Sequence, residues 1–221
     1  MNKRQKMLTV VLVAAVLLLG IIAAALRKIK VDNFKPAAIM FLIDSSASNQ
    51  KELPEQRKLL KQICNLLDPE DQIKIIRVSE DAYIIYEGAP FNTTNIDSAM
   101  NEFTKLNSKD YGTAYGLGLK KAFNYAKQMK KSGYIPSVVV IGDLENEGAA
   151  EKQLNWNTLP NDIKGVQAVA PEFSMMFLYA HPSKLDMVKE TLSPVLGEEK
   201  LIISPKQNCD KAIRQYINAL R

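Results

Sequence analysis

Cysteine, histidine and tryptophan are scarce in this sequence, with two, one and one of them in 221 residues. Cys64 and Cys209 either form one disulfide, which would join the first and last predicted helices, or remain as buried thiols. So low a count does not indicate whether the compartment is oxidising. His181 follows a predicted strand, where a lone histidine is usually structural or solvated. The sequence also has no internal repeat and no low-complexity tract.

Acidic residues are absent from the first 30 positions, which hold six basic residues. The formal charge of the whole chain is +5, so residues 31–221 have a net charge of −1. The high isoelectric point is therefore a property of the N-terminal segment. The remainder of the chain gives no electrostatic support for nucleic-acid binding, and we expect no nucleic-acid partner.

Charge is also absent from residues 7–26, an apolar run long enough to cross a bilayer as a helix. No cysteine lies near it, which excludes a lipoprotein anchor. A cleaved signal peptide is the alternative, since residues 23–25 are small. However, the run exceeds the length of a signal-peptide core and basic residues follow it at once. We therefore predict an uncleaved single-pass anchor that attaches the protein to a membrane.

This interpretation divides the chain into four segments: a basic tail (1–6), a transmembrane helix or signal anchor (7–26), a linker (27–36) and one domain (37–221). Three basic residues precede the apolar run and three follow it, so the positive-inside rule hardly selects an orientation. An N-terminal anchor with a short basic tail more often leaves the next domain outside the cytoplasm. We expect an extracytoplasmic domain, periplasmic or on the cell surface, in a bacterial envelope.

Strand and helix patterns alternate through the rest of the chain. We expect strands at residues 37–43, 73–79, 82–88, 137–143, 174–180 and 200–205. We expect helices at residues 54–67, 95–106, 112–133, 183–195 and 208–221, and surface loops within the long irregular stretch 149–173. This alternation predicts an α/β fold: a doubly wound, mostly parallel sheet flanked by helices, as in Rossmann-like folds.

Polar residues follow two of the apolar strands directly. The first strand ends in the sequence Asp44-Ser45-Ser46-Ala47-Ser48, and a later strand ends at Asp143. Thr113 opens the longest predicted helix. Because ligands bind beyond the carboxyl ends of strands in such sheets, we expect these segments to converge. Oxygen donors of this kind suit a hard divalent cation. The alternative is a simple helix N-cap cluster, since Ser and Asp are favoured there.

This set resembles the metal-ion-dependent adhesion site of the von Willebrand factor A family, and the element order fits from residue 35 to the C-terminus. The resemblance implies a Mg²⁺ or Mn²⁺ ion held by Ser46, Ser48 and Thr113. Asp44 and Asp143 would bind it directly or through water. It also implies a protein ligand that presents an Asp or Glu to complete the coordination sphere. Many family members have glycine after the last aspartate, whereas Leu144 follows Asp143 here. Glu145 and Glu147 beyond it either begin a following turn or helix, which is the preferred interpretation, or support or ligate the ion as alternative ligands.

The leading hypothesis is thus a membrane-anchored, non-enzymatic domain for metal-dependent protein–protein interaction. A metal-dependent phosphohydrolase of haloacid-dehalogenase type is the first alternative. It would need a second acid two residues after the strand-end aspartate, and that position is Ser46. The second alternative keeps the fold but makes the domain a structural subunit whose metal site is idle.

Overall fold

The computed structural model describes residues 15–20, 35–104 and 112–220. The chain divides into two compact units, Met1–Lys35 and Pro36–Arg221. Within the described ranges, no helix is both long enough and apolar enough to cross a membrane. The predicted span 7–26 falls mostly outside those ranges, because only residues 15–20 of it are described, as helix. The anchor therefore stays a prediction.

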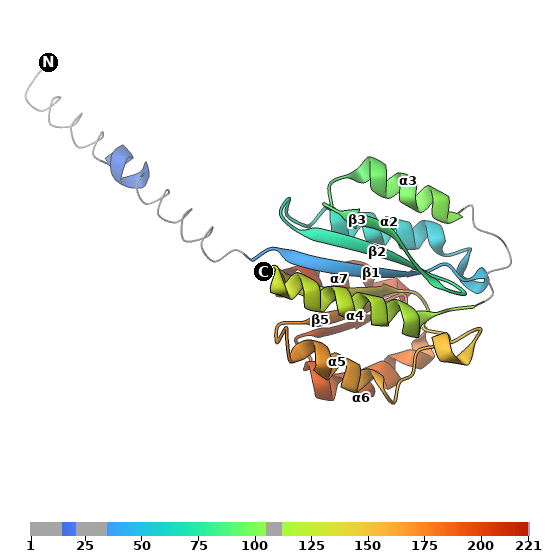
Figure 1. Cartoon of the computed structure of the whole chain (residues 1–221). Helices are drawn as coiled ribbons and strands as arrows, with labels where there is room; N and C mark the ends of the chain where they lie inside the picture. The colour runs from blue at the N-terminus through green and yellow to red at the C-terminus, as the bar shows by residue number, and fades with distance from the viewer. Residues whose placement is uncertain (1–14, 21–34, 105–111, 221) are drawn as a thin grey trace, which may run out of the picture. The chain divides into compact units, whose positions relative to one another are not determined.

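The second unit is built on one six-stranded sheet with the order β3-β2-β1-β4-β5-β6 (Figure 1). The strands are β1 (Ala37–Asp44), β2 (Gln72–Val78), β3 (Ala82–Gly88), β4 (Ile135–Ile141), β5 (Ser174–Leu178) and β6 (Leu201–Ser204). All neighbours pair in parallel except β2 and β3, which form an antiparallel hairpin at one edge. The predicted mostly parallel sheet is confirmed.

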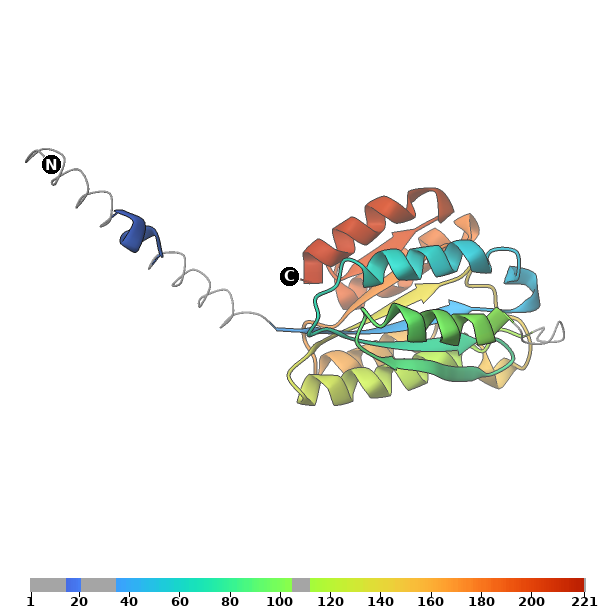
Figure 2. The same cartoon turned by 90° about the horizontal axis from the view of Figure 1, so that it is seen from above.

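Helices cover both faces of this sheet, and Figure 2 shows α4 on one side with α2 and α7 on the other. The helices are α2 (Leu53–Cys64), α3 (Thr93–Thr104), α4 (Tyr115–Lys131), α5 (Leu159–Gln167), α6 (Leu185–Leu196) and α7 (Cys209–Leu220). Side chains of α4, α5 and α6 form one buried apolar cluster with the sheet. Side chains of α2, α3 and α7 form the other. This is the doubly wound arrangement that the alternating pattern predicted.

The central strand β1 is buried along its whole length, which explains why its sequence is an unbroken apolar run. Its side chains alternate between the two clusters: Met40 and Leu42 face α4, whereas Ile39 and Phe41 face α2 and α7. Gly118 lets α4 approach closely, since a Cβ there would lie 3.1 Å from a Leu42 methyl and 3.0 Å from one of Val78. The position of α4 against β1 therefore depends on this glycine.

The structure corrects two expectations and decides one open alternative. The stretch 149–173 contains the nine-residue helix α5 in addition to loops, and its start at Thr158, with a proline in the first turn, is a helix-start signal that the sequence interpretation did not use. The long helix begins at Tyr115, so Thr113 lies in the loop before it. Of the two alternatives left open for Cys64 and Cys209, the structure has the second, because both are buried free thiols. Burial raises the pKa of the Cys64 thiol to about 12.

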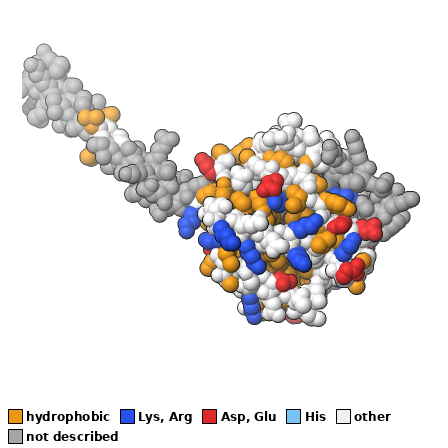
Figure 3. Space-filling view, viewed as in Figure 1, with side chains coloured by type: hydrophobic (Ala, Val, Ile, Leu, Met, Phe, Trp, Pro, Cys, Tyr) orange, Lys and Arg blue, Asp and Glu red, His pale blue; other side chains and the backbone are white. Residues whose placement is uncertain are grey.

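The outer surface of α4 carries lysines, but they are not isolated. Figure 3 shows Lys and Arg side chains interspersed with Asp and Glu on this face. Lys130 pairs with Glu172, and the Lys121 ammonium donates to the carbonyl of Ala82 at 2.5 Å. These lysines thus tie the helix to neighbouring segments, in addition to facing solvent.

A buried aspartate fixes the start of the sheet. One Asp71 carboxylate oxygen accepts the Ala37 backbone N–H and the other accepts that of Asp68, both at 2.7 Å. Asp71 is fully buried. It therefore orients the first residue of β1 where the chain enters the domain.

We expect Asp71→Ala to lower the free energy of unfolding by about 1–3 kcal/mol, because one buried and one part-buried backbone N–H group lose their acceptor. Urea denaturation of the full-length chain measures this. Asp71→Asn keeps one acceptor oxygen and should lose less. Equal stability of the alanine variant and the natural chain would contradict the role given to Asp71.

Candidate metal centre

The candidate site lies where the chain order of the sheet reverses. From β1 the chain crosses to β2 on one side, and β4 occupies the other side. Both neighbours of β1 are parallel to it, so the loops after β1 and β4 leave the same edge and open a crevice between them. Asp44 is the last residue of β1, and Asp143 comes two residues after β4. The predicted convergence of these segments follows from this topology.

Asp44 is held by three hydrogen bonds although it is fully buried. Its Oδ1 accepts the backbone N–H of Ser46 at 2.8 Å. Its Oδ2 accepts the Asn49 side-chain amide at 2.7 Å and the Tyr115 hydroxyl at 2.9 Å. Since a carboxylate oxygen accepts about two hydrogen bonds, Oδ2 is saturated and only Oδ1 has capacity left.

The pKa of the Asp44 carboxyl is raised to about 6, mainly by burial and also by the charge of Asp143, while hydrogen bonds from Ser46 and Asn49 limit the rise. Burial also raises the pKa of Tyr115 well above its usual value, with the charges of Asp44 and Asp143 adding to the effect. Two acids therefore repel each other at this edge of the sheet. A cation between them would offset that repulsion.

Two serine hydroxyls lie together beside Asp44. The Oγ atoms of Ser46 and Ser48 are 3.0 Å apart. This is a hydrogen-bond distance, and it is also the edge of an octahedron with metal–oxygen bonds of about 2.1 Å, which is about 3.0 Å. A Mg²⁺-sized ion could thus accept both oxygens without moving either. Ser45 points elsewhere, because its Oγ donates to the Val78 carbonyl and accepts from the Arg77 Nε.

Thr113 and Asp143 are placed by backbone contacts. The Thr113 N–H donates to the carbonyl of Glu147 at 2.9 Å, and Thr113 is buried. Asp143 Oδ1 accepts the N–H of Glu145 at 2.9 Å, and its carbonyl accepts the N–H of His181. Within the described part of the chain, neither side chain bonds directly to Asp44 or the two serines. The structure therefore links Asp44, Ser46 and Ser48 by bonds and brings the other two to the same edge.

Three further residues complete the cluster: Asn49 and Tyr115, which sequence reasoning missed, and Glu147, which it weighed as an alternative ligand. Asn49 and Tyr115 bind the Asp44 carboxylate, and Glu147 Oε2 accepts the Ser48 hydroxyl at 3.1 Å. Gly142 makes room for this arrangement, since a Cβ there would lie 2.0 Å from the Tyr115 hydroxyl oxygen. The only sequence signal for Tyr115 is its place two residues after Thr113, in the first turn of α4.

Leu144 occupies the position where the family often has glycine. Its φ is +65°, and its side chain is buried among the α4-side cluster. This left-handed conformation costs an L-residue roughly 1 kcal/mol and is free for glycine. The conformation explains the family's preference for glycine there, and the buried leucine side chain compensates for its absence.

His181, the only histidine, follows β5 at the same edge, and its side chain bonds locally to Ser183. Its Nδ1 is 2.8 Å from the Ser183 hydroxyl, and it caps a short 3₁₀ turn, Pro182–Lys184. Next to it, the Lys184 ammonium pairs with Glu145 at 3.0 Å. Glu145 is thereby drawn toward the β5 side, so only Glu147 of the two acids bonds to the serine pair.

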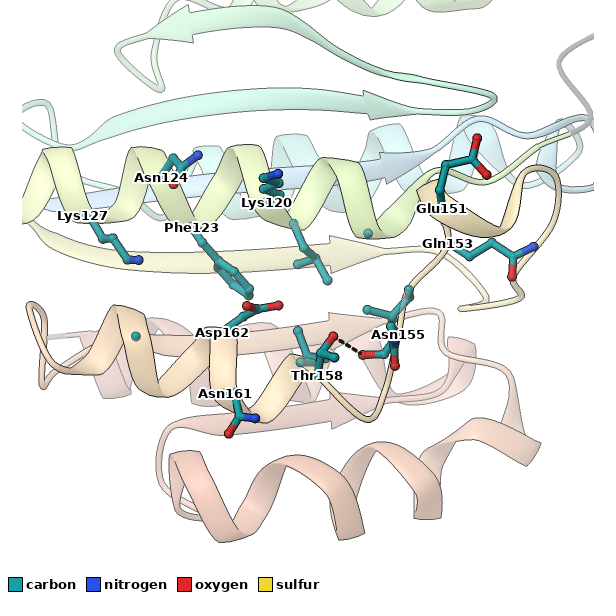
Figure 4. Close-up of a pocket in the computed structure, with 15 residues that line it drawn as sticks. Lys120, Phe123, Asn124, Lys127, Glu151, Gln153, Asn155, Thr158, Asn161 and Asp162 are labelled. Atoms are coloured by element: carbon teal, nitrogen blue, oxygen red, sulfur yellow. Dashed lines mark hydrogen bonds between the residues drawn. The ribbon is translucent and has the colours of Figure 1, made fainter.

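A separate groove of about 490 Å³ lies between α4 and α5 (Figure 4). Lys120, Phe123 and Lys127 line it from α4, Asp162 lines it from α5, and Thr158 lines it just before α5 begins. None of the five predicted site residues is among its lining. The groove is distinct from the strand-end cluster, so we do not assign the metal centre to it.

The donor set suits a hard cation. The described residues hold no cluster of three or more His, Cys, Asp or Glu side chains at metal-binding distance. The cluster offers serine and threonine hydroxyls with carboxylates instead, and hard ions such as Mg²⁺ take oxygen ligands while keeping several waters. The residues present therefore fit Mg²⁺ or Mn²⁺.

Comparison with known proteins agrees with this architecture. A sequence model of the von Willebrand factor type A domain matches residues 39–146. The fold is that of a von Willebrand factor type A domain. A von Willebrand factor type A protein from Catenulispora acidiphila superposes with a TM-score of 0.60 and 14% identity. That match covers 84% of this chain and 43% of the other. Domains of this type generally mediate protein–protein interactions.

Two further solved structures share the fold. The pilus adhesin SpaC from Lactobacillus rhamnosus GG gives a TM-score of 0.59 at 12% identity, over 84% of this chain and 30% of SpaC. An aerotolerance-related membrane protein from Bacteroides fragilis gives 0.53 at 16% identity, over 82% of this chain and 98% of that one. The chain thus spans less than half of the first two proteins. A search of curated proteins found no significant match.

Tyr115→Phe tests the hydrogen bonds around Asp44. The change removes one of two donors to Asp44 Oδ2, so we expect the free energy of unfolding to fall by about 1–3 kcal/mol in metal-free buffer. Tyr83→Phe is the matched control, because the Tyr83 side chain is half-exposed and its loss should stay within about 0.5 kcal/mol. Urea denaturation compares the two. Equal small losses would show that Tyr115 acts through its ring alone.

Proposed function

We propose that the domain binds a Mg²⁺ or Mn²⁺ ion at Asp44, Ser46, Ser48, Thr113 and Asp143 and uses it to bind an acidic side chain of a partner protein. The observation that carries this proposal is the pair of serine hydroxyls, 3.0 Å apart, beside a buried aspartate at the reversal point of the sheet. Support comes from the family match, which spans β1 to the loop after β4.

The hydrogen bonds of Asp44 indicate its role toward the ion. Three donors already engage its carboxylate, so we assign Asp44 to binding through water rather than directly. Neutral hydroxyls then make up most of the direct protein ligands. An ion held mainly by neutral ligands keeps its affinity for an incoming carboxylate. The cation would supply charge attraction to the partner acid, and the protein side chains would fix the direction of approach.

This arrangement favours recognition over catalysis, and the phosphohydrolase alternative is not favoured. A phosphatase of that type needs a proton-donating acid two residues after Asp44, and Ser46 stands there with its hydroxyl directed at Ser48. The pilus adhesin SpaC shares the fold. We therefore propose a binding module and not an enzyme.

Thermal unfolding with and without Mg²⁺ or Mn²⁺ tests the site. At a cation concentration about 100 times the Kd, binding stabilises the folded state by about 2.7 kcal/mol. For a chain of this size that raises the unfolding midpoint by roughly 5–10 °C. Ser48→Ala should lose most of this metal-dependent rise.

Ser45→Ala is the matched control, since its hydroxyl binds the Val78 carbonyl and not the cluster. Its absolute stability should fall, but its metal-dependent rise should remain. If the unfolding midpoint of the natural chain does not rise with the cation, the thermal unfolding is repeated with added acetate or glutamate, which supplies the partner carboxylate. No rise under either condition would contradict the proposed site and favour the idle-subunit alternative.

We also propose that residues 7–26 anchor the chain in a membrane, with the domain outside the cytoplasm. The apolar run and its basic flanks support the anchor. Further support is the similarity to the Bacteroides fragilis membrane protein, which is matched over nearly its whole length. A binding module on the outer side of a bacterial membrane would present its metal edge to envelope or extracellular partners.

A reporter fused to the C-terminus tests this orientation. Alkaline phosphatase is active only outside the bacterial cytoplasm, so we expect an active fusion that stays with the membrane after alkaline carbonate extraction. An inactive fusion would reverse the orientation. An active fusion that is released by carbonate would indicate a cleaved signal peptide instead of an anchor.

A further inference from the structure

The loop after β4 brings a carboxylate of this chain to the serine pair. Ser48 Oγ donates to Glu147 Oε2 at 3.1 Å, across 99 positions of sequence. This distance is again close to the edge of an octahedron around a Mg²⁺-sized ion, about 3.0 Å. Ser46, Ser48 and Glu147 therefore present three oxygens in series, each at the spacing that adjacent ligands of one ion would have.

The backbone fixes Glu147 at this place. Its carbonyl accepts the N–H of Thr113 at 2.9 Å, so the residue is bonded to two of the five proposed metal-site residues. Gly148 has φ +82°, and a Cβ there would lie 2.9 Å from the Gly112 Cα. The loops before α4 and after β4 thus touch through two glycines. No larger residue at position 148 would allow this approach.

The same loop is closed on its other side. The Asn146 amide donates to the Leu154 carbonyl and accepts the Leu154 N–H, at 2.9 and 3.0 Å. The Gln153 amide donates to the Gly148 carbonyl at 2.8 Å. These bonds hold residues 146–148 from both ends, so the approach of Glu147 to Ser48 is built into the loop conformation.

Glu147 and Glu145 differ in their charged partners. Glu145 pairs with Lys184, whereas Glu147 has no basic partner among the residues that the structure describes. A carboxylate bonded to Ser48 without a counter-charge adds to the negative charge of an edge that already holds Asp44 and Asp143. A divalent cation at the serine pair would be its nearest source of compensation.

We propose that Glu147 is a further ligand of the cation. Its carboxylate would bind the cation beside Ser48, at the coordination position that the carboxylate of a partner protein would otherwise take. This inference rests on the proposed metal site and deepens it. In the absence of a partner the domain ligates its own ion, and partner binding requires displacement of Glu147. The domain then holds its cation tightly and binds acidic partners more weakly than it would without this residue.

Calorimetric titration of the full-length chain in detergent with Mn²⁺, beside Glu147→Gln and Glu145→Gln, tests the proposal. The glutamine at 147 can still accept the Ser48 hydroxyl, so folding is preserved. We expect Glu147→Gln to weaken Mn²⁺ binding by about 10-fold or more. Glu145→Gln, which loses only the pair with Lys184, should bind Mn²⁺ as the natural chain does.

Water-proton relaxation of bound Mn²⁺ gives an independent readout, because each water on the ion enhances it. Glu147→Gln should hold one more exchangeable water than the natural chain, and added acetate should displace that water more readily. Unchanged affinity and water count in Glu147→Gln would overturn the inference while leaving the metal site intact. An equal loss of Mn²⁺ affinity in Glu145→Gln would also overturn it, since the removal of any negative charge at this edge would then explain the weaker binding. If the natural chain binds no Mn²⁺, even with acetate, the proposed function fails together with the inference.

Discussion

The hydrogen bonding of one buried carboxylate organises the functional edge of this domain. Asp44 ends the central strand, and donors from its own loop and from α4 converge on it. Each donor comes from a segment that also carries a proposed metal-site residue. Because an unpaired buried carboxylate is costly, the fold is stable only when these segments meet. The position of the Ser46–Ser48 loop thus follows from the need to hydrogen-bond the buried Asp44 carboxylate.

Small residues let the surrounding loops close on that point. Gly142 leaves space for the Tyr115 hydroxyl, and Gly112 and Gly148 allow two loops to touch. Leu144, in contrast, takes a left-handed backbone conformation, and the burial of its side chain offsets the cost of that conformation. The result is an edge whose oxygen donors are held by backbone geometry. Such pre-organisation suits a site that recognises a ligand through an ion, since little ordering is left to occur on binding.

The proposed internal ligation by Glu147 changes how the negative charge of the edge is understood. Sequence reasoning weighed the acids after Asp143 mainly as the start of a turn. The structure divides them: Lys184 draws Glu145 aside, and the glycine contact brings Glu147 to Ser48. If Glu147 completes the coordination sphere of the cation, it would raise the affinity for the cation and lower the affinity for an acidic partner.

The sequence by itself determined the strands, most of the helices, the doubly wound class and the segments that meet at the edge, because buried parallel strands leave long apolar runs ending in polar residues. Sequence reasoning did not assign α5, which is only nine residues long and lies within an irregular stretch. It left open whether Cys64 and Cys209 form a disulfide or stay as buried thiols, and the structure has them as free thiols. Only the tertiary structure decided the partners of Asp44 and the contact of Glu147 with Ser48. These depend on side-chain directions and loop approaches between residues up to 99 positions apart, and local sequence patterns carry no record of such distances.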